Sequence, residues 1–196
     1  DGCAELGIPV TGGNVSLYNS SGEESINPTP VVATLGVLDD VATATASGWA
    51  EEGLAIIAFG DVEDELDGSA WARTLHDHLG GLPPRVDFGR EAALANVLIA
   101  LADAEITRAA HDVSNGGLIQ TLTDMALRSN IGASIDLAPF AADDVVALFS
   151  ETQARAVIAV SAEHVAVVAA AAEAEGVAAM RIGTTGGARL VIEGEA

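Results

Sequence analysis

A run of apolar residues from Leu54 to Phe59, bounded by Gly53 and Gly60, most constrains the fold of this chain. The run is too short for a helix, and it has no polar face. It therefore predicts a buried strand. Strand-like and helix-like patterns interleave after it without a repeat period, which favours packed layers of helices and sheet. We predict an α+β fold with mixed α/β layers.

The pattern after this strand is clear enough to assign elements. The clearest helix covers residues 87–105, where Asp87 can cap the first amides and Glu91 favours the positive end of the helix dipole. The other predicted helices cover residues 68–79, about 117–127, 141–149 and 164–175. The other predicted strands cover residues 108–112, 132–137 and 155–160, and a closing hairpin pairs 177–182 with 189–192 over Thr185-Gly186-Gly187.

The first 48 residues have a different character, with short apolar runs separated by polar turns. We expect a short strand at Ile8–Val10 and a longer one at Thr29–Leu38, opened by Pro28 and Pro30. Residues 41–48 are small and read as a connection. The predicted domains are therefore residues 1–48 and 49–196. The chain does not begin with Met, and we expect it to be a fragment of a longer protein.

Composition excludes several functions. The 196 residues carry a net charge of −21, with 29 acidic residues and eight basic ones, all of which are arginine. So acidic a chain is unsuited to nucleic acid or anionic membranes. Without lysine it supplies no Schiff base and no phosphate-binding lysine. A bound nucleotide would need backbone amides, arginine or a metal ion.

Compartment and membrane association follow from two further features. The single cysteine, Cys3, cannot form an internal disulfide, so a reducing, cytoplasmic setting is the expectation. No apolar run approaches the roughly 20 residues that cross a bilayer, and we expect no membrane association.

A first glycine-rich segment runs from Pro9 to Asn19. Gly12 and Gly13 come directly after the expected strand and could turn backbone N–H groups toward a phosphate. Asn14 could then offer an oxygen to Mg²⁺, and Ser16 could donate a hydrogen bond. The alternative is a plain glycine turn closed by a bond from the Asn14 side chain, and the pattern alone favours this alternative.

A second glycine-rich turn, His111 to Gly117, joins a predicted strand to a predicted helix. Such a turn suits an anion at the helix start, with Ser114 as the cap, Asp112 as a metal ligand, and Gly116 and Gly117 allowing close approach. The alternative is purely structural, with Ser114 capping the helix and Asp112 bonding to local amides. The spacing matches neither a Walker loop nor a Rossmann fingerprint.

Two weaker candidates have structural readings that we favour. Glu151, Thr152 and Gln153 precede Arg155 between a helix and a strand, where the carboxylate and the guanidinium could serve a ligand or pair with each other. An acidic cluster, formed by Asp61, Glu63, Asp64, Glu65 and Asp67, reads as a solvated loop.

Six motifs, in order along the chain, resemble one family. They are GIPVTGGNVSLYN with INPTPVVATLGVLDD, LDGSAWA, VDFGREAALANVL, AHDVSNGGLIQTLTDMAL and LFSETQARAVIAV. Together they resemble the C-terminal part of the phosphoribosylformylglycinamidine synthase subunit II (PurL) family, within the AIR synthase-related superfamily. The unbroken Gly-Gly-Asn-Val-Ser-Leu-Tyr-Asn, with Pro-Thr-Pro-Val-Val behind it, separates this family from the rest of the superfamily.

The resemblance implies an activity. Members of the family are carbon–nitrogen ligases of purine biosynthesis. They use ATP and Mg²⁺ to convert formylglycinamide ribonucleotide and ammonia, released from glutamine, to formylglycinamidine ribonucleotide. Their implied partners are a glutaminase subunit, PurQ, and a small subunit, PurS. Self-association of the fragment is left open.

The resemblance also implies residue roles. Gly13 matches an ATP contact, Asn14 a Mg²⁺ ligand and Ser16 a substrate contact, all in the tail of a second AIR synthase N-terminal-like domain. Residues 49–196 then form an AIR synthase C-terminal-like domain. Its turn and loop correspond to a degenerate half-site, and we favour a structural or vestigial role for the residues Asp112, Ser114, Gly116, Gly117, Glu151 and Gln153.

The family's catalytic histidine lies outside this sequence, so the chain alone is expected to be inactive. Two rival functions stay open at this point. One is an ATP-dependent small-molecule kinase of the same superfamily, and the other is a non-catalytic nucleotide-sensing or assembly module.

Overall fold

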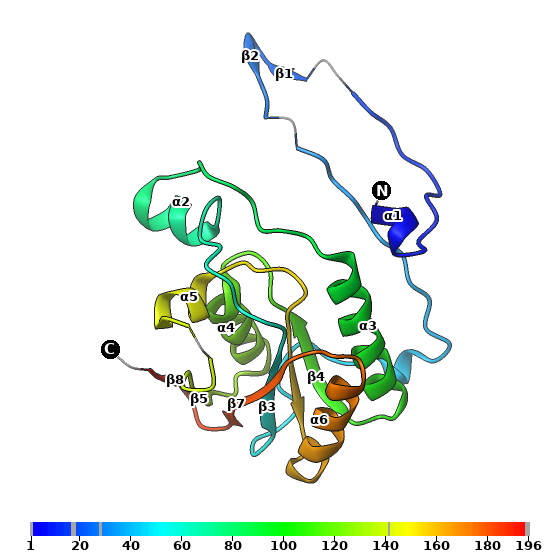
Figure 1. Cartoon of the computed structure of the whole chain (residues 1–196), viewed down its shortest axis with the longest axis vertical. Coiled ribbons are helices and arrows are strands. Elements are labelled where there is room, and N and C mark those ends of the chain that lie inside the picture. Colours follow the sequence, from blue (N-terminus) through cyan, green and yellow to red (C-terminus); the bar gives the residue numbers. More distant parts are fainter. Residues whose placement is uncertain (1, 17–18, 28, 141, 195–196) are drawn as a thin grey trace. The chain divides into compact units, whose positions relative to one another are not determined.

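The computed structural model describes residues 2–16, 19–27, 29–140 and 142–194. It divides into two units, residues 1–42 and 43–196, which are described separately (Figure 1). Leu17 and Tyr18 of the first glycine-rich segment, Pro28, and the expected helix start at Ala141 lie outside the described residues. The domain boundary at residue 48 stays a prediction.

The first unit contains little regular structure. Its elements are helix α1 (Gly2–Glu5) and the short antiparallel strands β1 (Ser20–Ser21) and β2 (Glu24–Ser25). The 3₁₀ turn η1 (Val41–Thr43) spans the boundary with the second unit. The predicted strands at Ile8–Val10 and Thr29–Leu38 are wrong, because the described residues there are irregular and exposed. A strand needs a hydrogen-bonded neighbour, and no described segment pairs with either run.

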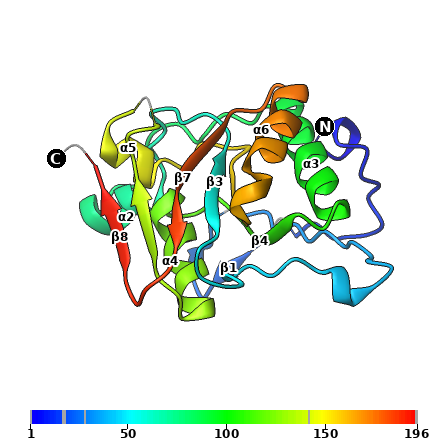
Figure 2. The same cartoon turned by 90° about the horizontal axis from the view of Figure 1, so that it is seen from below.

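The second unit is built on a six-stranded sheet with the order β4-β6-β3-β7-β5-β8 (Figure 2). All neighbouring strands are antiparallel except β5 and β8, which are parallel. Every residue of β3 and β6 is buried, which confirms the predicted buried strand. The strands are β3 (Ala55–Phe59), β4 (Thr107–Asp112), β5 (Ala133–Asp136), β6 (Ala156–Val160), β7 (Ala179–Thr185) and β8 (Leu190–Glu193).

The predicted helices of this unit are present, four with shorter bounds and α4 with a slightly later end. They are α2 (Ala70–His76), α3 (Phe88–Asp103), α4 (Gly117–Ser129), α5 (Asp144–Phe149) and α6 (Val165–Ala174), the last preceded by the 3₁₀ turn η2 (Ala162–His164). Asp87 caps α3 as predicted, because its Oδ1 accepts from the N–H groups of Gly89 (2.9 Å) and Arg90 (3.1 Å).

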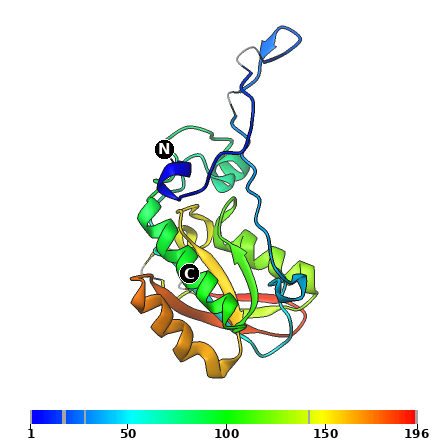
Figure 3. The ribbon, with the colours of Figure 1, turned by 90° about the vertical axis from the view of Figure 1, so that its right-hand side faces the viewer.

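Helices cover both faces of the sheet, so the unit has three layers. Alternate residues of β3 divide between two cores. Ile56 and Ala58 belong to the core that contains Leu118 and Leu122 of α4. The opposite face packs against α3 and α6, through buried residues that include Val97, Leu101 and Val168. Figure 3 shows α3 and α4 on opposite sides of the strands. The predicted α+β class is confirmed.

The predicted closing hairpin is wrong, because β5 lies between β7 and β8. The turn after β7 instead wraps around Gly132. Gly132 N–H donates to Gly187 O (2.7 Å), and Gly186 N–H donates to Gly132 O (2.8 Å). A side chain at Gly132 would collide with the backbone of Arg189. Glycine therefore lets the turn pass close enough for β8 to pair with β5.

Candidate functional site

The first glycine-rich segment lies in irregular backbone of the first unit. Gly12, Gly13, Asn14 and Ser16 are all exposed, and no strand precedes them. The alternative of a plain glycine turn closed by the Asn14 side chain also stays a prediction, because the segment includes residues 17 and 18, which lie outside the described residues. Among the described contacts, Ser16 contributes its carbonyl, which accepts from Asn19 Nδ2 (3.3 Å). The roles of Gly13, Asn14 and Ser16 therefore stay predictions.

The second unit brings the remaining predicted site residues together. Glu151 Oε1 accepts from Gly116 N–H and from Ala70 N–H, both at 2.7 Å. One carboxylate oxygen thus joins the start of α4 to the start of α2. Gln153 Nε2 donates to the carbonyl of Glu151 (3.1 Å), within the same loop. The turn before α4 and the loop after α5 therefore form one junction. The Glu151 carboxylate holds it together by accepting hydrogen bonds from backbone amides.

Gly116, rather than Ser114, is the N-cap of α4. Gly116 has φ 84° and makes no side-chain capping bond, while the carbonyl of Ser114 accepts from Gly117 N–H (3.0 Å). The predicted capping by Ser114 is wrong, because the extra residues of the turn place its side chain beside Asp112 instead. Gly117, at φ 70°, fits tightly against the backbone of Leu148 and Phe149 at the end of α5.

Asp112 ends β4, and its carboxyl has a lowered pKa. A hydrogen bond from Ser114 is the main cause that lowers the pKa of Asp112, and partial burial opposes it. A backbone hydrogen bond and electrostatic interactions with His111 and Arg128 lower this pKa further. His111 Nδ1 lies 3.1 Å from Asp112 Oδ1, while the side chain of Asp112 remains 70% exposed. The carboxylate is ionised and accessible.

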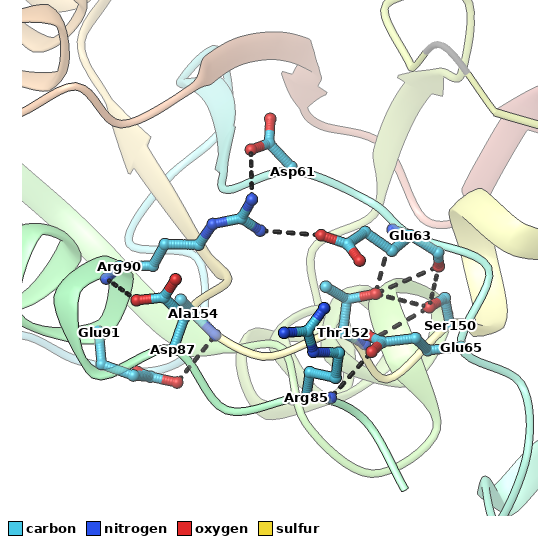
Figure 4. Close-up of polar contacts among 10 residues, drawn as sticks. All are labelled: Asp61, Glu63, Glu65, Arg85, Asp87, Arg90, Glu91, Ser150, Thr152 and Ala154. Atoms are coloured by element: carbon cyan, nitrogen blue, oxygen red, sulfur yellow. Dashed lines mark hydrogen bonds and ion pairs between the residues drawn. The ribbon is translucent and has the colours of Figure 1, made fainter. Parts of the chain in front are cut away.

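Thr152 and Ser150 anchor the same loop to the acidic segment before α2. Thr152 is 3% exposed, and its Oγ1 accepts from Glu63 N–H (3.1 Å). Ser150 Oγ donates to Glu63 O (2.7 Å) and lies 2.9 Å from Thr152 Oγ1 (Figure 4). Both hydroxyls already form hydrogen bonds within the chain, so they hold this loop against the acidic segment.

The acidic segment is not simply a solvated loop, which corrects the prediction. Glu63 pairs with Arg90 (2.9 Å), and Asp61 lies 3.9 Å from the same guanidinium (Figure 4). Hydrogen bonding to Glu63 raises the pKa of Arg90. Glu65 Oε1 accepts from Arg85 N–H (2.8 Å). These contacts border a small cavity of about 130 Å³, lined by Glu63, Glu65, Arg85, Val86, Asp87, Arg90, Thr152, Gln153 and Ala154.

Arg85 and Arg90 are the site residues that sequence reasoning missed. Their place in the sequence could have indicated them. They flank the capping Asp87 after a double proline, and the chain has only eight basic residues. Glu91 was assigned only to the helix dipole, yet its Oε1 also accepts from Ala154 N–H (2.9 Å). The expected pairing of Glu151 with Arg155 is absent among the described contacts, because Glu151 accepts hydrogen bonds from the backbone amides of Ala70 and Gly116 instead.

Comparison with known proteins identifies the family. Residues 51–194 match the family described as AIR synthase related protein, C-terminal domain. The chain belongs to this family. A curated relative from Leifsonia xyli, "Phosphoribosylformylglycinamidine synthase subunit PurL", is 49% identical over 189 residues, which is 94% of this chain and 24% of the relative. A relative of the same name from Renibacterium salmoninarum is 54% identical over 164 residues, or 82% and 21% of the two chains.

Solved structures show the same fold. T. maritima PurL complexed with FGAR superposes with a TM-score of 0.66 at 18% identity, over 74% of this chain and 26% of that one. T. maritima PurL complexed with ATP gives a TM-score of 0.60 at 18% identity, over 78% and 24%. This chain of the AIR synthase-related family thus spans about a quarter of the length of the relatives that it matches.

Within the described part of this family member, no three His, Cys, Asp or Glu residues gather as a metal site. Asn14 and Asp112 each offer oxygen ligands, but they lie in different units. No helix among the described residues is long and apolar enough to cross a membrane.

Proposed function

We propose that this chain serves as the C-terminal part of an ATP-dependent synthetase. The synthetase converts formylglycinamide ribonucleotide and ammonia to formylglycinamidine ribonucleotide in purine biosynthesis. The observation that carries the proposal is 46–54% identity to curated relatives, all of which are named as this synthase subunit. The matching fold, found in PurL structures with ATP and with FGAR, supports it.

In this proposal the two units have different tasks. Residues 1–48 complete an AIR synthase N-terminal-like domain, in which Gly13 contacts ATP, Asn14 supplies one Mg²⁺ ligand and Ser16 contacts the substrate. Their exposure supports this assignment, because each of the three residues is accessible to a ligand. The catalytic histidine and the other metal ligands come from elsewhere in the synthetase. The isolated chain has no turnover.

Residues 49–196 form the AIR synthase C-terminal-like domain, whose junction around Glu151 is structural. The engaged state of Glu151 and Thr152 supports this role, since groups that already bond within the chain are not available to a ligand. Ammonia comes from glutamine through a glutaminase subunit, PurQ, and a small subunit, PurS, completes the cytoplasmic assembly.

The decisive experiment replaces Asn14 with Ala in the full-length protein that carries this chain. We expect ammonia-dependent formation of formylglycinamidine ribonucleotide to fall at least about tenfold, with a raised requirement for Mg²⁺, because a metal ligand is lost. Asn27→Ala, an exposed position in the same unit, is the matched control. An unchanged rate and Mg²⁺ dependence in Asn14→Ala would rule out the metal role.

The product distinguishes the synthetase from its rival. A synthetase incorporates ammonia and releases inorganic phosphate, whereas a small-molecule kinase leaves phosphate on a stable product. Incubation of the full-length protein with ¹⁵N-ammonia, ATP and formylglycinamide ribonucleotide should give a ¹⁵N-labelled product. A phosphorylated product without ¹⁵N would contradict the proposal.

A further inference from the structure

A second hollow in the 43–196 unit has a charge arrangement that the proposed function does not use. It measures about 500 Å³ and lies between α3, the end of β4 and the start of β6. Its apolar wall includes Leu94, Ala95 and Leu98 of α3, together with Ala110. Its polar lining consists of Ser47, Glu91, His111, Asp112, Arg128 and Arg155. An apolar wall beside converging polar groups is a combination found in small-molecule sites.

Arg155 is the unusual member of this lining. Its side chain is 4% exposed, and Nη1 donates to Ser150 O (3.1 Å), but Nη2 is buried without a hydrogen-bond partner. No described carboxylate forms an ion pair with it. Burial lowers the pKa of Arg155 to about 10. A buried guanidinium without a counter-charge costs free energy, so a neighbouring anion would be stabilising.

Neither carboxylate of the hollow forms an ion pair with Arg155 among the described residues. Glu91 Oε1 accepts from Ala154 N–H (2.9 Å). Asp112 accepts from Ser114 and lies 3.1 Å from His111 Nδ1. Arg128 donates from Nη1 to Ser47 Oγ (2.6 Å), so it brings a second guanidinium to the lining without an ion pair among the described residues. The counter-charge that Arg155 needs is therefore not supplied by the lining itself.

We propose that this hollow binds a small organic oxyanion, a carboxylate or a phosphate ester, whose charged group lies beside Arg155. The apolar part of the ligand would pack on Leu94, Ala95 and Leu98 of α3. Such a ligand satisfies both features of the hollow, because the oxyanion compensates the guanidinium and the apolar body covers the wall. The proposal is independent of the synthetase function.

The test measures binding of phenyl phosphate, benzoate and neutral benzyl alcohol to the 196-residue chain by calorimetry. We expect saturable binding of at least one of the two anions, and binding of benzyl alcohol at least about tenfold weaker, because a hydrogen bond to a charged group is lost. Which anion binds tighter distinguishes a phosphate ester from a carboxylate. Absence of saturable anion binding, or equal binding of the alcohol, overturns the proposal.

Variants assign the binding to this hollow. Arg155→Met should reduce anion affinity at least about tenfold. Arg108→Gln should leave it unchanged, because Arg108 pairs with Glu51 (3.1 Å) away from the hollow. Ala95→Trp fills the hollow from an exposed helix position and keeps Arg155 in place, so it tests the site even if Arg155→Met fails to fold. Anion binding that survives Ala95→Trp overturns the proposal.

Discussion

At the scale of single residues, Glu151 shows how a carboxylate can act entirely within the fold. From sequence, it could bind a ligand or pair with Arg155. In the structure its Oε1 accepts from the first amide of α2 and from the N-cap amide of α4, each at 2.7 Å. Amides at helix starts have no partner within their own helix, and a carboxylate satisfies them well. Glu151 therefore ties two helices to one loop.

Replacing this carboxylate should destabilise the protein. Glu151→Ala leaves the amides of Ala70 and Gly116 without their acceptor, and we expect unfolding free energy to fall by about 2 kcal/mol. Glu151→Gln keeps an acceptor oxygen, so its unfolding free energy should fall by about half as much as that of Glu151→Ala. Urea denaturation followed by circular dichroism measures both values.

The matched control for this prediction is Glu173→Ala, at an exposed position of α6. Glu173→Ala should change the free energy of unfolding by less than about 0.5 kcal/mol. If Glu151→Ala were as stable as the control, the two hydrogen bonds would contribute nothing to folding, and the role assigned to Glu151 would be wrong.

At the scale of elements, the start of α4 depends on close contact with the end of α5. A Cβ added at Gly117 would lie 2.6 Å from Leu148 O and 2.8 Å from the carbonyl carbon of Phe149. Both are backbone atoms, which cannot move aside as a flexible side chain would. Glycine at this position is needed for packing as well as for its φ of 70°.

A pair of variants separates these two requirements. Gly176 has φ 69° with no atom near its missing Cβ, so Gly176→Ala should cost only the backbone strain of about 1–2 kcal/mol. Gly117→Ala adds a steric clash and should cost at least about 1 kcal/mol more. Thermal and urea unfolding measure the difference. Equal losses in the two variants would contradict the packing role.

At the scale of the whole molecule, the two units differ in how they are stabilised. The 43–196 unit has buried cores on both faces of its sheet. In the first unit, every described residue from 3 to 42 is exposed, including Val31 at 92% and Leu35 at 95%. Hydrophobic burial is the main stabilising term in folding, so the larger unit should carry nearly all of the stability.

A shortened chain that begins at Thr43 should therefore fold by itself. We expect its thermal midpoint to lie within about 2 °C of that of the 196-residue chain, because the removed residues bury almost no apolar surface. Differential scanning calorimetry of both chains tests this. A midpoint lower by more than about 5 °C would show that residues 1–42 stabilise the larger unit.

The sequence by itself determined the elements between residues 54 and 194. Apolar periodicity, the Asp87 cap and the glycine turns are local signals, so strands and helices such as β3 and α3 were predicted closely. The same signals indicated the second glycine-rich turn, His111 to Gly117, as a candidate site. They did not determine which groups those residues would contact.

Only the tertiary structure decided the pairings. It placed β5 between β7 and β8, and it left residues 8–10 and 29–38 without strand partners. It also paired the Glu151 carboxylate with two backbone amides and not with Arg155. The physical reason is that strand order and polar partners depend on segments far apart in the chain. A period of two or 3.6 residues specifies which face is apolar, but it does not name the neighbour that covers it.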